Sequence, residues 1–165
     1  MGGGHPERLL CVLTIAAYLT FCDEALDAYA VIVRELGESR ANASLPSVEG
    51  SNSAFVLVAH VVGVMGRWGS TVNRGIVVPR DRDAEFTAVG SVQEALALLE
   101  SGRARLHEDV RATDPTAPPA NPPLDRDDTY ATQGEVLMHV YEELAQHLGQ
   151  LEVTRDVLLA TQRRD

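Results

Sequence analysis

The chain has 165 residues, of which 45% are hydrophobic and 23% are charged, and its formal net charge at pH 7 is -10. This length and composition fit a single domain with a substantial apolar core. A strongly acidic chain lacks the basic patches that bind nucleic-acid backbones or anionic membrane surfaces, so we expect neither kind of partner.

The first predicted helix extends from Glu7 to Leu36 and is ended by Gly37. Residues 9–19 within it are almost entirely apolar, a pattern that the core of a signal peptide would share. This run is too short to span a bilayer, which requires about 20 residues. We therefore expect one helix that continues into the folded domain, with a signal peptide as the alternative.

The two cysteines, Cys11 and Cys22, both fall on this predicted helix. At these positions on one helix they would lie roughly 16 Å apart along the axis. A disulfide requires Cα atoms within about 7 Å of each other, so the two residues cannot be bridged there. We expect reduced thiols, as in a cytoplasmic protein.

The second predicted helix covers residues 51–73 and is capped by Ser51 or Asn52. Its middle, AFVLVAHVVGVM, is apolar on nearly every side, which indicates burial. His60 stands in the centre of this run, and a buried imidazole must be hydrogen-bonded or coordinated. The sequence of this helix leaves both roles open, and Trp68 is expected on the same face.

A charged segment, PRDRDAEF, follows the second helix. Such an alternation is typical of a solvated, ion-paired turn, with Phe86 as the side chain that docks it. Its charged residues are Arg80, Asp81, Arg82, Asp83 and Glu85. The third predicted helix, residues 91–110, then begins at a capping box formed by Ser91 and Glu94.

Five prolines lie between Ala112 and Asp128. Such a stretch cannot be a helix or a central strand, so it is predicted to be a long crossover from the third helix to the fourth. The fourth predicted helix covers residues 132–160 and opens with Thr132 and Glu135 at the spacing of a second capping box.

Two stripes of side chains run along the fourth helix. The apolar stripe, which should face the core, consists of Leu137, Val140, Leu144, Leu148, Leu151 and Leu158. Beside it His139, Glu143 and His147 recur every fourth residue, and Gln150 continues the row. This polar row is either a solvated edge of the helix or a pair of inward-facing ligands, because a carboxylate and an imidazole four residues apart converge on one point.

Four helices of bundle length and a long connection predict an all-α fold, a four-helix bundle with a Pro-rich crossover between helices three and four. Metal sites in such bundles are built from side chains on facing helices. His60 on the second helix is therefore placed to meet Glu143 and His147 on the fourth. We predict that these three residues bind a divalent metal, with zinc as the best candidate, because two imidazoles and one carboxylate leave one coordination position open.

Three stretches of the chain, SNSAFVLVAHVVGVMGRW, PRDRDAEF and HVYEELAQHLGQLEVTRD, resemble the DinB-like superfamily. The resemblance is closest to its actinobacterial branch of mycothiol-dependent transferases, and it covers about residues 19–160. It implies a four-helix bundle in which one histidine of helix two and two residues of helix four bind a divalent metal. His60, Glu143 and His147 fall on those positions.

The carboxylate at Glu143 sets this chain apart from many members of the superfamily, which have histidine at that position. Mycothiol-dependent maleylpyruvate isomerase is similar to this chain in using a carboxylate. The residues before about Thr20 depart from the family pattern. We accordingly divide the chain into an N-terminal extension, residues 1–18, that continues into helix one, and a DinB-like bundle, residues 19–161.

The resemblance implies a cytoplasmic thiol transferase that activates a low-molecular-weight thiol, mycothiol, for attack on a small electrophile. His139, Gln150 and Trp68 would then orient the ligands or the thiol. Arg82 and Arg155 are candidates to bind substrate carboxylates, but their residue type and setting favour a surface ion pair for each.

Two other classes of function stay open. A metal-dependent hydrolase or isomerase of small molecules would use the same three ligands, with water in place of the thiol. A metal-free binding or scaffold protein would use none of them. A homodimer is one assembly that any of these proteins could form.

Overall fold

The computed structural model describes residues 14–123 and 130–161. Within these ranges the chain is helical and contains no strand, which confirms the predicted all-α class. The elements are α1 (Ile15–Leu36), α2 (Ala54–Met65), the π-helical segment η1 (Gly66–Asn73), α3 (Arg82–Glu85), α4 (Val92–Arg111) and α5 (Gln133–Thr161).

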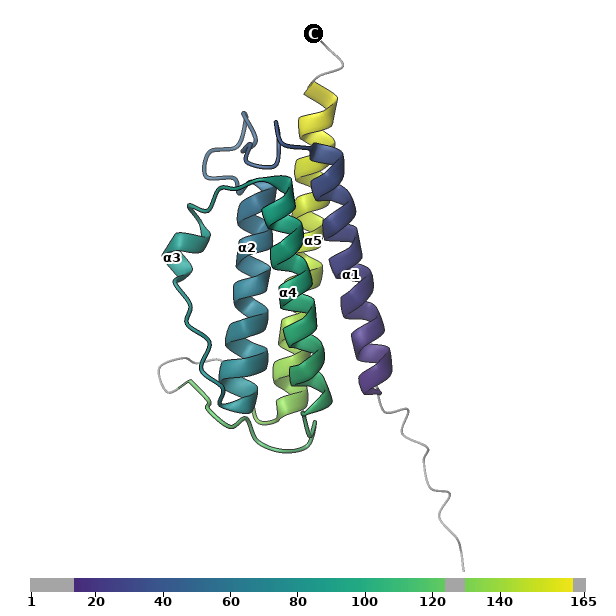
Figure 1. Cartoon of the computed structure of the whole chain (residues 1–165), viewed down its shortest axis with the longest axis vertical. Coiled ribbons are helices and arrows are strands. Elements are labelled where there is room, and N and C mark those ends of the chain that lie inside the picture. Colours follow the sequence, from purple (N-terminus) through teal and green to yellow (C-terminus); the bar gives the residue numbers. More distant parts are fainter. Residues whose placement is uncertain (1–13, 124–129, 162–165) are drawn as a thin grey trace, which may run out of the picture.

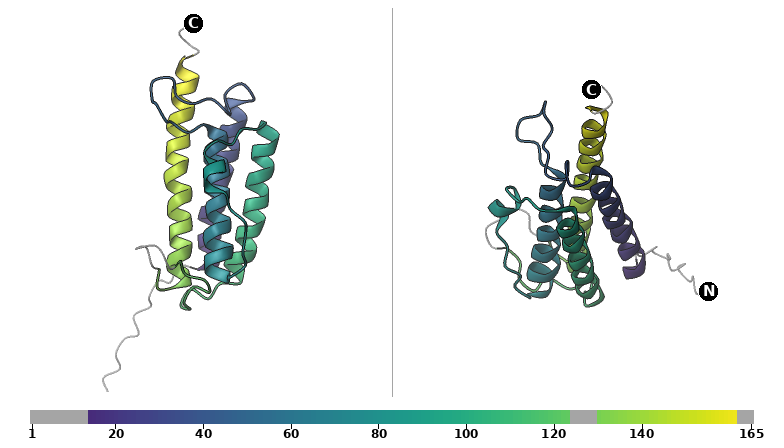
Figure 2. Two further views of the ribbon diagram at one scale, coloured as in Figure 1. Left: turned by 90° about the vertical axis from the view of Figure 1, so that its left-hand side faces the viewer. Right: turned by 45° about the horizontal axis from the view of Figure 1, so that its top comes forward.

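Four long helices stand side by side as a bundle, and the short α3 lies outside α2 (Figures 1 and 2). Both α1 and α2 pack against α4 and α5 but scarcely against each other, so they occupy opposite corners. The longest helix, α5, has 29 residues and extends beyond the others toward the C-terminus (Figure 1). The predicted four-helix bundle is thus confirmed, with α5 and α2 as neighbours.

Helix α1 begins later than the sequence indicated. Thr14 has an extended backbone, and its hydroxyl accepts a hydrogen bond from the backbone N–H of Ala17 at 3.1 Å, which makes it the N-cap. The predicted continuation of the helix back to Glu7 is therefore wrong at Thr14. Residues 1–13, and with them Cys11, lie outside the described part of the chain, whereas Cys22 is a buried free thiol. The division between an extension and a bundle at residue 18 stays a prediction.

Helix α2 begins at Ala54, because the hydroxyl of Ser53 caps it by accepting from Val56 N–H at 3.2 Å. The predicted caps, Ser51 and Asn52, are therefore wrong by one or two residues. The helical stretch Ala54–Asn73 is long and apolar enough to cross a membrane by length and composition. Since 78% of its apolar window is buried inside the bundle, it is a core helix.

The predicted cap of the third long helix is confirmed, because the Ser91 hydroxyl accepts from Glu94 N–H and the Glu94 carboxylate accepts from Ser91 N–H. The start of α5 differs in one detail. Thr132 accepts from Glu135 N–H at 3.2 Å, but the Glu135 carboxylate accepts from Ala131 N–H instead of closing the box at Thr132.

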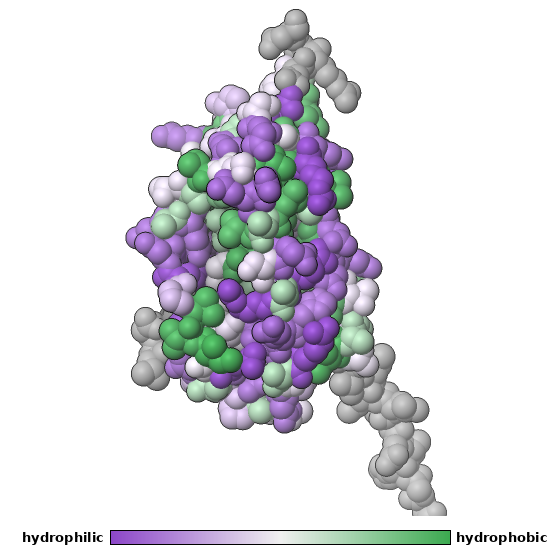
Figure 3. Space-filling view, in the orientation of Figure 1, coloured by the Kyte–Doolittle hydropathy of each residue, from purple (hydrophilic) through white to green (hydrophobic). Residues whose placement is uncertain are grey.

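The core lies between the four long helices, and its largest fully buried side chains include Leu26, Tyr29, Leu57, Leu106, Leu144 and Leu151. Along α5 the predicted apolar stripe is buried, apart from the partly buried Leu148. Polar and charged side chains cover much of the face seen in Figure 3. The polar row of α5 is therefore the part of this helix whose role the core does not explain.

The Pro-rich segment after α4 contains no helix in its described part, residues 112–123. It is held to the end of η1, where Asn121 N–H donates to the carbonyl of Val72 at 2.9 Å. It is also held to the start of α5, where Gln133 N–H donates to the carbonyl of Ala117 at 2.8 Å. Residues 124–129 lie outside the described part, so the full course of the crossover stays a prediction.

Candidate metal centre

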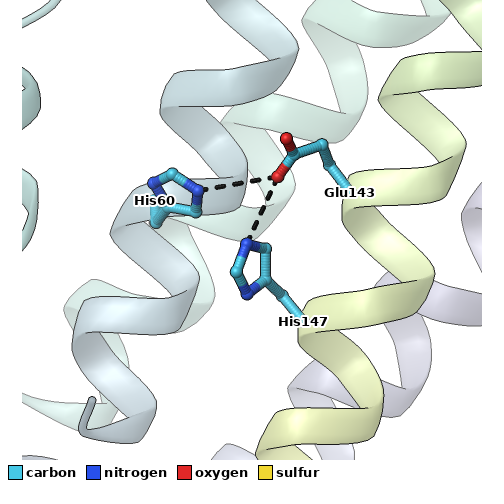
Figure 4. A group of neighbouring side chains, drawn as sticks. All are labelled: His60, Glu143 and His147. Atoms are coloured by element: carbon cyan, nitrogen blue, oxygen red, sulfur yellow. Dashed lines mark ion pairs between the residues drawn. The ribbon is translucent and has the colours of Figure 1, made fainter. Parts of the chain in front are cut away.

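Three polar side chains converge between α2 and α5: His60 from α2, and Glu143 and His147 from α5 (Figure 4). Glu143 Oε2 lies 3.2 Å from His147 Nε2 and 3.7 Å from His60 Nε2. One ligand atom from each residue lies within 4.8 Å of the other two. The two imidazole rings meet edge to face, with centroids 4.7 Å apart. The structure therefore brings together the three residues that the sequence selected.

The helices explain this placement. Glu143 and His147 are one turn apart on α5, so both side chains leave the helix on the same side. Their row lies next to the apolar stripe that packs into the core, which turns it toward α2 at the edge of the interface. His60 reaches the same point because the apolar residues around it hold the middle of α2 inside the bundle.

Each histidine has an outer hydrogen-bond partner. His60 Nδ1 lies 3.0 Å from Glu85 Oε2, and His147 Nδ1 lies 3.1 Å from Gln150 Oε1. Both partners are oxygen acceptors at these contacts, so each imidazole carries its proton on Nδ1 and keeps a lone pair on Nε2. Histidines that bind metals are held in this way, with the outer nitrogen donating to a carboxylate or another acceptor.

The inner atoms are therefore three electron-pair donors that face one another. When the cluster holds a proton and no metal, hydrogen bonds from His147 and then from His60 hold the pKa of Glu143 well below its usual range. In turn, the hydrogen bond to Glu143 raises the pKa of His147. Such a cluster requires a positive charge at its centre, either a shared proton or a cation. Two imidazole nitrogens and one carboxylate oxygen are a donor set that zinc accepts, so the residues fit a divalent metal.

The cluster is closed on one side and open on the other. The His60 side chain is 7% exposed, whereas Glu143 is 27% and His147 is 23% exposed. The α2 side of the cluster therefore lies inside the bundle, and the α5 side is in contact with solvent.

A comparison with protein families identifies the chain. The family model described as Mycothiol-S-transferase matches residues 17–159, which is most of the sequence and includes all three candidate ligands. The chain belongs to the mycothiol-S-transferase family. This confirms the predicted resemblance to the mycothiol-dependent branch of the DinB-like proteins. A search of curated proteins finds no significant match.

In this mycothiol-S-transferase family member, His139 lies beside the second oxygen of Glu143, with His139 Nε2 3.6 Å from Glu143 Oε1. The edge of the Trp68 ring contacts His139 at a centroid distance of 4.8 Å, and Tyr130 stacks on it at 5.2 Å. Trp68 is buried. His139 and Gln150 thus each contact one candidate ligand, whereas Trp68 contacts His139, and the roles expected for these three residues stay predictions.

The two arginines proposed as substrate contacts differ in position. Arg82 is exposed on α3 and lies over the ring of Phe86, which itself contacts His60 at a centroid distance of 5.2 Å. Arg155 pairs with Asp156 at 2.8 Å and with Glu35 of α1 at 3.6 Å. Arg82 therefore reaches the cluster only through Phe86 and His60, whereas Arg155 makes ion pairs, the role that the sequence favoured for it.

Sequence reasoning missed Glu85. The charged segment around it was predicted to be a solvated turn, but Glu85 is buried, accepts from His60 and pairs with Arg80. That prediction is wrong for Glu85 because α3 docks against α2 and carries the carboxylate into the protein. Phe86, the residue expected to dock this segment, contacts the His60 ring but is itself 40% exposed, so the buried residue of the segment is Glu85.

Proposed function

We propose that this member of the mycothiol-S-transferase family is a metal-dependent thiol S-transferase. It would join a low-molecular-weight thiol, mycothiol, to a small electrophile in the cytoplasm. Family membership supports the thiol and the transferase class. The metal dependence is supported by one observation, the convergence of the lone pairs of His60, Glu143 and His147 at a point that solvent can reach.

The three ligands of this proposal are His60 Nε2, Glu143 Oε2 and His147 Nε2. A zinc ion held there would supply Lewis acidity, which lowers the pKa of a thiol and favours the nucleophilic thiolate. Glu143 contributes one negative charge to the set and the two imidazoles contribute none. A variant with histidine at position 143 should therefore keep the metal but give a less electron-rich, slower thiol centre.

The remaining residues orient the reactants. Gln150 and Glu85 hold the two imidazoles by their Nδ1 atoms, and His139 lies against the outer oxygen of Glu143. In the transfer, the thiol loses its proton and its sulfur forms a bond to an electrophilic carbon. That proton leaves with the departing group in a substitution, or is returned to the product in an addition. Arg82, which lies over the Phe86 ring beside His60, would attract an anionic electrophile.

A metal-dependent hydrolase or isomerase is the second candidate, because the partial exposure of Glu143 and His147 admits water as readily as a thiol. A hydrolase would turn over its substrate without any thiol. The two candidates therefore differ in their need for a co-substrate.

The test begins with elemental analysis of protein purified without a histidine tag, for which we expect about one divalent metal ion per chain. The zinc-loaded protein is then incubated with a low-molecular-weight thiol and a generic alkylating electrophile, and thiol loss is followed over time. The comparison samples are chelator-treated protein, the Glu143→Ala variant and the matched Glu152→Ala variant, which removes an exposed carboxylate from the same helix. Loss of activity in the first two samples but not in the third supports the proposal. Equal rates in every sample, across several thiols and electrophiles, contradict it.

A further inference from the structure

The carboxylate of Glu85 packs against α2, and both of its oxygens accept hydrogen bonds. Its Oε2 atom accepts from His60 Nδ1 at 3.0 Å and from Arg80 Nη2 at 2.8 Å. Its Oε1 atom accepts from Arg80 Nε at 2.5 Å. Arg80 thus grips both oxygens with two parallel hydrogen bonds, the geometry that fixes a carboxylate most firmly. The Glu85 side chain is only 9% exposed, so it is a buried charge with its partners in place.

Gly63 makes this position available. It lies on α2 three residues after His60, in the interior of an otherwise apolar helix where glycine lowers stability relative to alanine. A Cβ atom added at Gly63 would lie 2.0 Å from Glu85 Oε1 and 3.1 Å from Arg80 Nε. The Glu85 carboxylate therefore occupies the space that a side chain at residue 63 would fill.

We propose that Glu85 is a positioning residue for the metal ligand His60, and that Gly63 and Arg80 hold Glu85 in place for this role. This inference rests on the proposed metal centre. By accepting the Nδ1 proton, Glu85 fixes the tautomer of His60, orients its ring and makes Nε2 a stronger electron-pair donor toward Glu143 and His147. The Arg80 guanidinium offsets the negative charge that Glu85 brings into the protein.

The competing explanation is that Glu85 only fastens α3 to the bundle. Both explanations predict that its loss lowers thermal stability, so a melting temperature alone cannot separate them. They differ in two other properties. Only the positioning role predicts a change in the tautomer of His60 in the metal-free protein and a change in zinc affinity of variants that remain folded.

The experiment compares Glu85→Ala and Gly63→Ala with the wild type and with the matched control Gly149→Ala, a helical glycine whose added Cβ would meet nothing within 4 Å. Zinc affinity is measured by competition with a chromophoric chelator. The tautomer of His60 is measured by nitrogen NMR of the imidazoles in metal-free protein. We expect Gly63→Ala to fold, because the atom that the new Cβ would meet is Oε1, at the end of the flexible Glu85 side chain. Glu85 should therefore move, and α2 should keep its position.

In the two test variants zinc affinity should fall by about 10- to 100-fold, the usual range for the outer partner of a ligand. His60 should also lose its preference for a proton on Nδ1, and Gly149→Ala should behave as the wild type. Because Gly63→Ala acts by displacing Glu85, adding it to Glu85→Ala should lower the affinity no further. Independent losses in the double variant would overturn the role of Gly63.

Folded variants with wild-type affinity and a wild-type His60 tautomer would overturn the proposal and leave Glu85 as an anchor of α3. If an alanine variant does not fold, Glu85→Met keeps the length of the side chain but removes both acceptor oxygens, and unchanged affinity in this variant would count equally against the proposal. If the wild type binds no zinc, the proposed function fails. The tautomer measurement then decides the role of Glu85 by itself, since it requires no metal.

Discussion

The phenol of Tyr29 in α1 donates a hydrogen bond to the main-chain carbonyl of Leu144 in α5, at 3.0 Å, and the Tyr29 side chain is fully buried. Leu144 directly follows Glu143. Tyr18 makes the same kind of bond to the carbonyl of Leu137 at 2.7 Å. These two bonds fix the position of α5 along α1, and the first does so beside the candidate ligands.

Replacing Tyr29 with phenylalanine should therefore lower the free energy of unfolding by about 0.5 to 1.5 kcal/mol, because the ring packing is kept and one hydrogen bond is lost. Urea denaturation measures this change. The matched control is Tyr141→Phe, at a partly buried tyrosine whose ring packs on Phe21. Equal losses in the two variants would show that the bond to Leu144 contributes nothing of its own.

The His147→Ala variant should lose metal binding and activity but keep a folded bundle, since the apolar stripe of α5 is untouched. Elemental analysis and circular dichroism measure the two properties. Gln146→Ala, at the exposed neighbouring position, should change neither. For comparison, Leu144→Ala removes a fully buried side chain and should cost about 2 to 5 kcal/mol of stability. If His147→Ala destabilises the protein as much as Leu144→Ala, then His147 is mainly structural.

Metal removal should lower the thermal stability of the wild type, but the helices should stay folded at room temperature. A ligand that binds the native state adds about 2.7 kcal/mol when present at 100 times its dissociation constant, provided that it does not bind the unfolded chain. Melting curves recorded with added zinc and with a chelator measure this difference. His147→Ala should show no such difference, and a shift of equal size in that variant would point to metal bound elsewhere.

Stability should also fall in alkaline solution. Burial raises the pKa of the Cys22 thiol from its ordinary value of 9.0 to about 11, and burial also raises the pKa of Tyr18 and Tyr29. Between pH 9 and pH 11 the unfolded thiol has released its proton while the folded one retains it. The unfolded chain thus binds fewer protons, and the free energy of unfolding decreases by up to about 1.4 kcal/mol per pH unit for this group.

Urea denaturation at pH 8, 9 and 10 measures this decrease. The Cys22→Ala variant should show a smaller decrease between pH 9 and pH 10, where the tyrosines have only begun to contribute. An identical pH dependence in the variant and the wild type would mean that the Cys22 thiol titrates alike in the folded and unfolded chains.

Those parts of the fold that depend on neighbouring residues could be predicted from the sequence. The capping box of Ser91 and Glu94 was predicted correctly because both of its hydrogen bonds join residues three apart. The start of α1 was not, because apolar periodicity continues through Thr14 and does not reveal that its backbone leaves the helical region. The π-helical turns of η1 were not predicted for a similar reason, since the apolar pattern around them is that of one continuous helix.

The candidate site divides in the same way. Glu143 and His147 could be paired from their spacing on one helix, and His60 stood out as the imidazole in an apolar run. Glu85 could not be found by either rule. Its burial depends on the docking of α3 against the bare backbone of Gly63, two segments whose approach no local pattern encodes.

In the proposed metal centre, the spacing of Glu143 and His147 would make α5 a chelating unit by itself. In the terms of coordination chemistry, this helix would be a bidentate ligand and α2 would add a monodentate one. A helix of 29 residues is long enough to form partly before α2 docks, so its two donors can be gathered in a chain that is not yet folded. Such a chain would keep some affinity for the metal, and the stabilisation of the native state would be smaller than the affinity of the complete site implies.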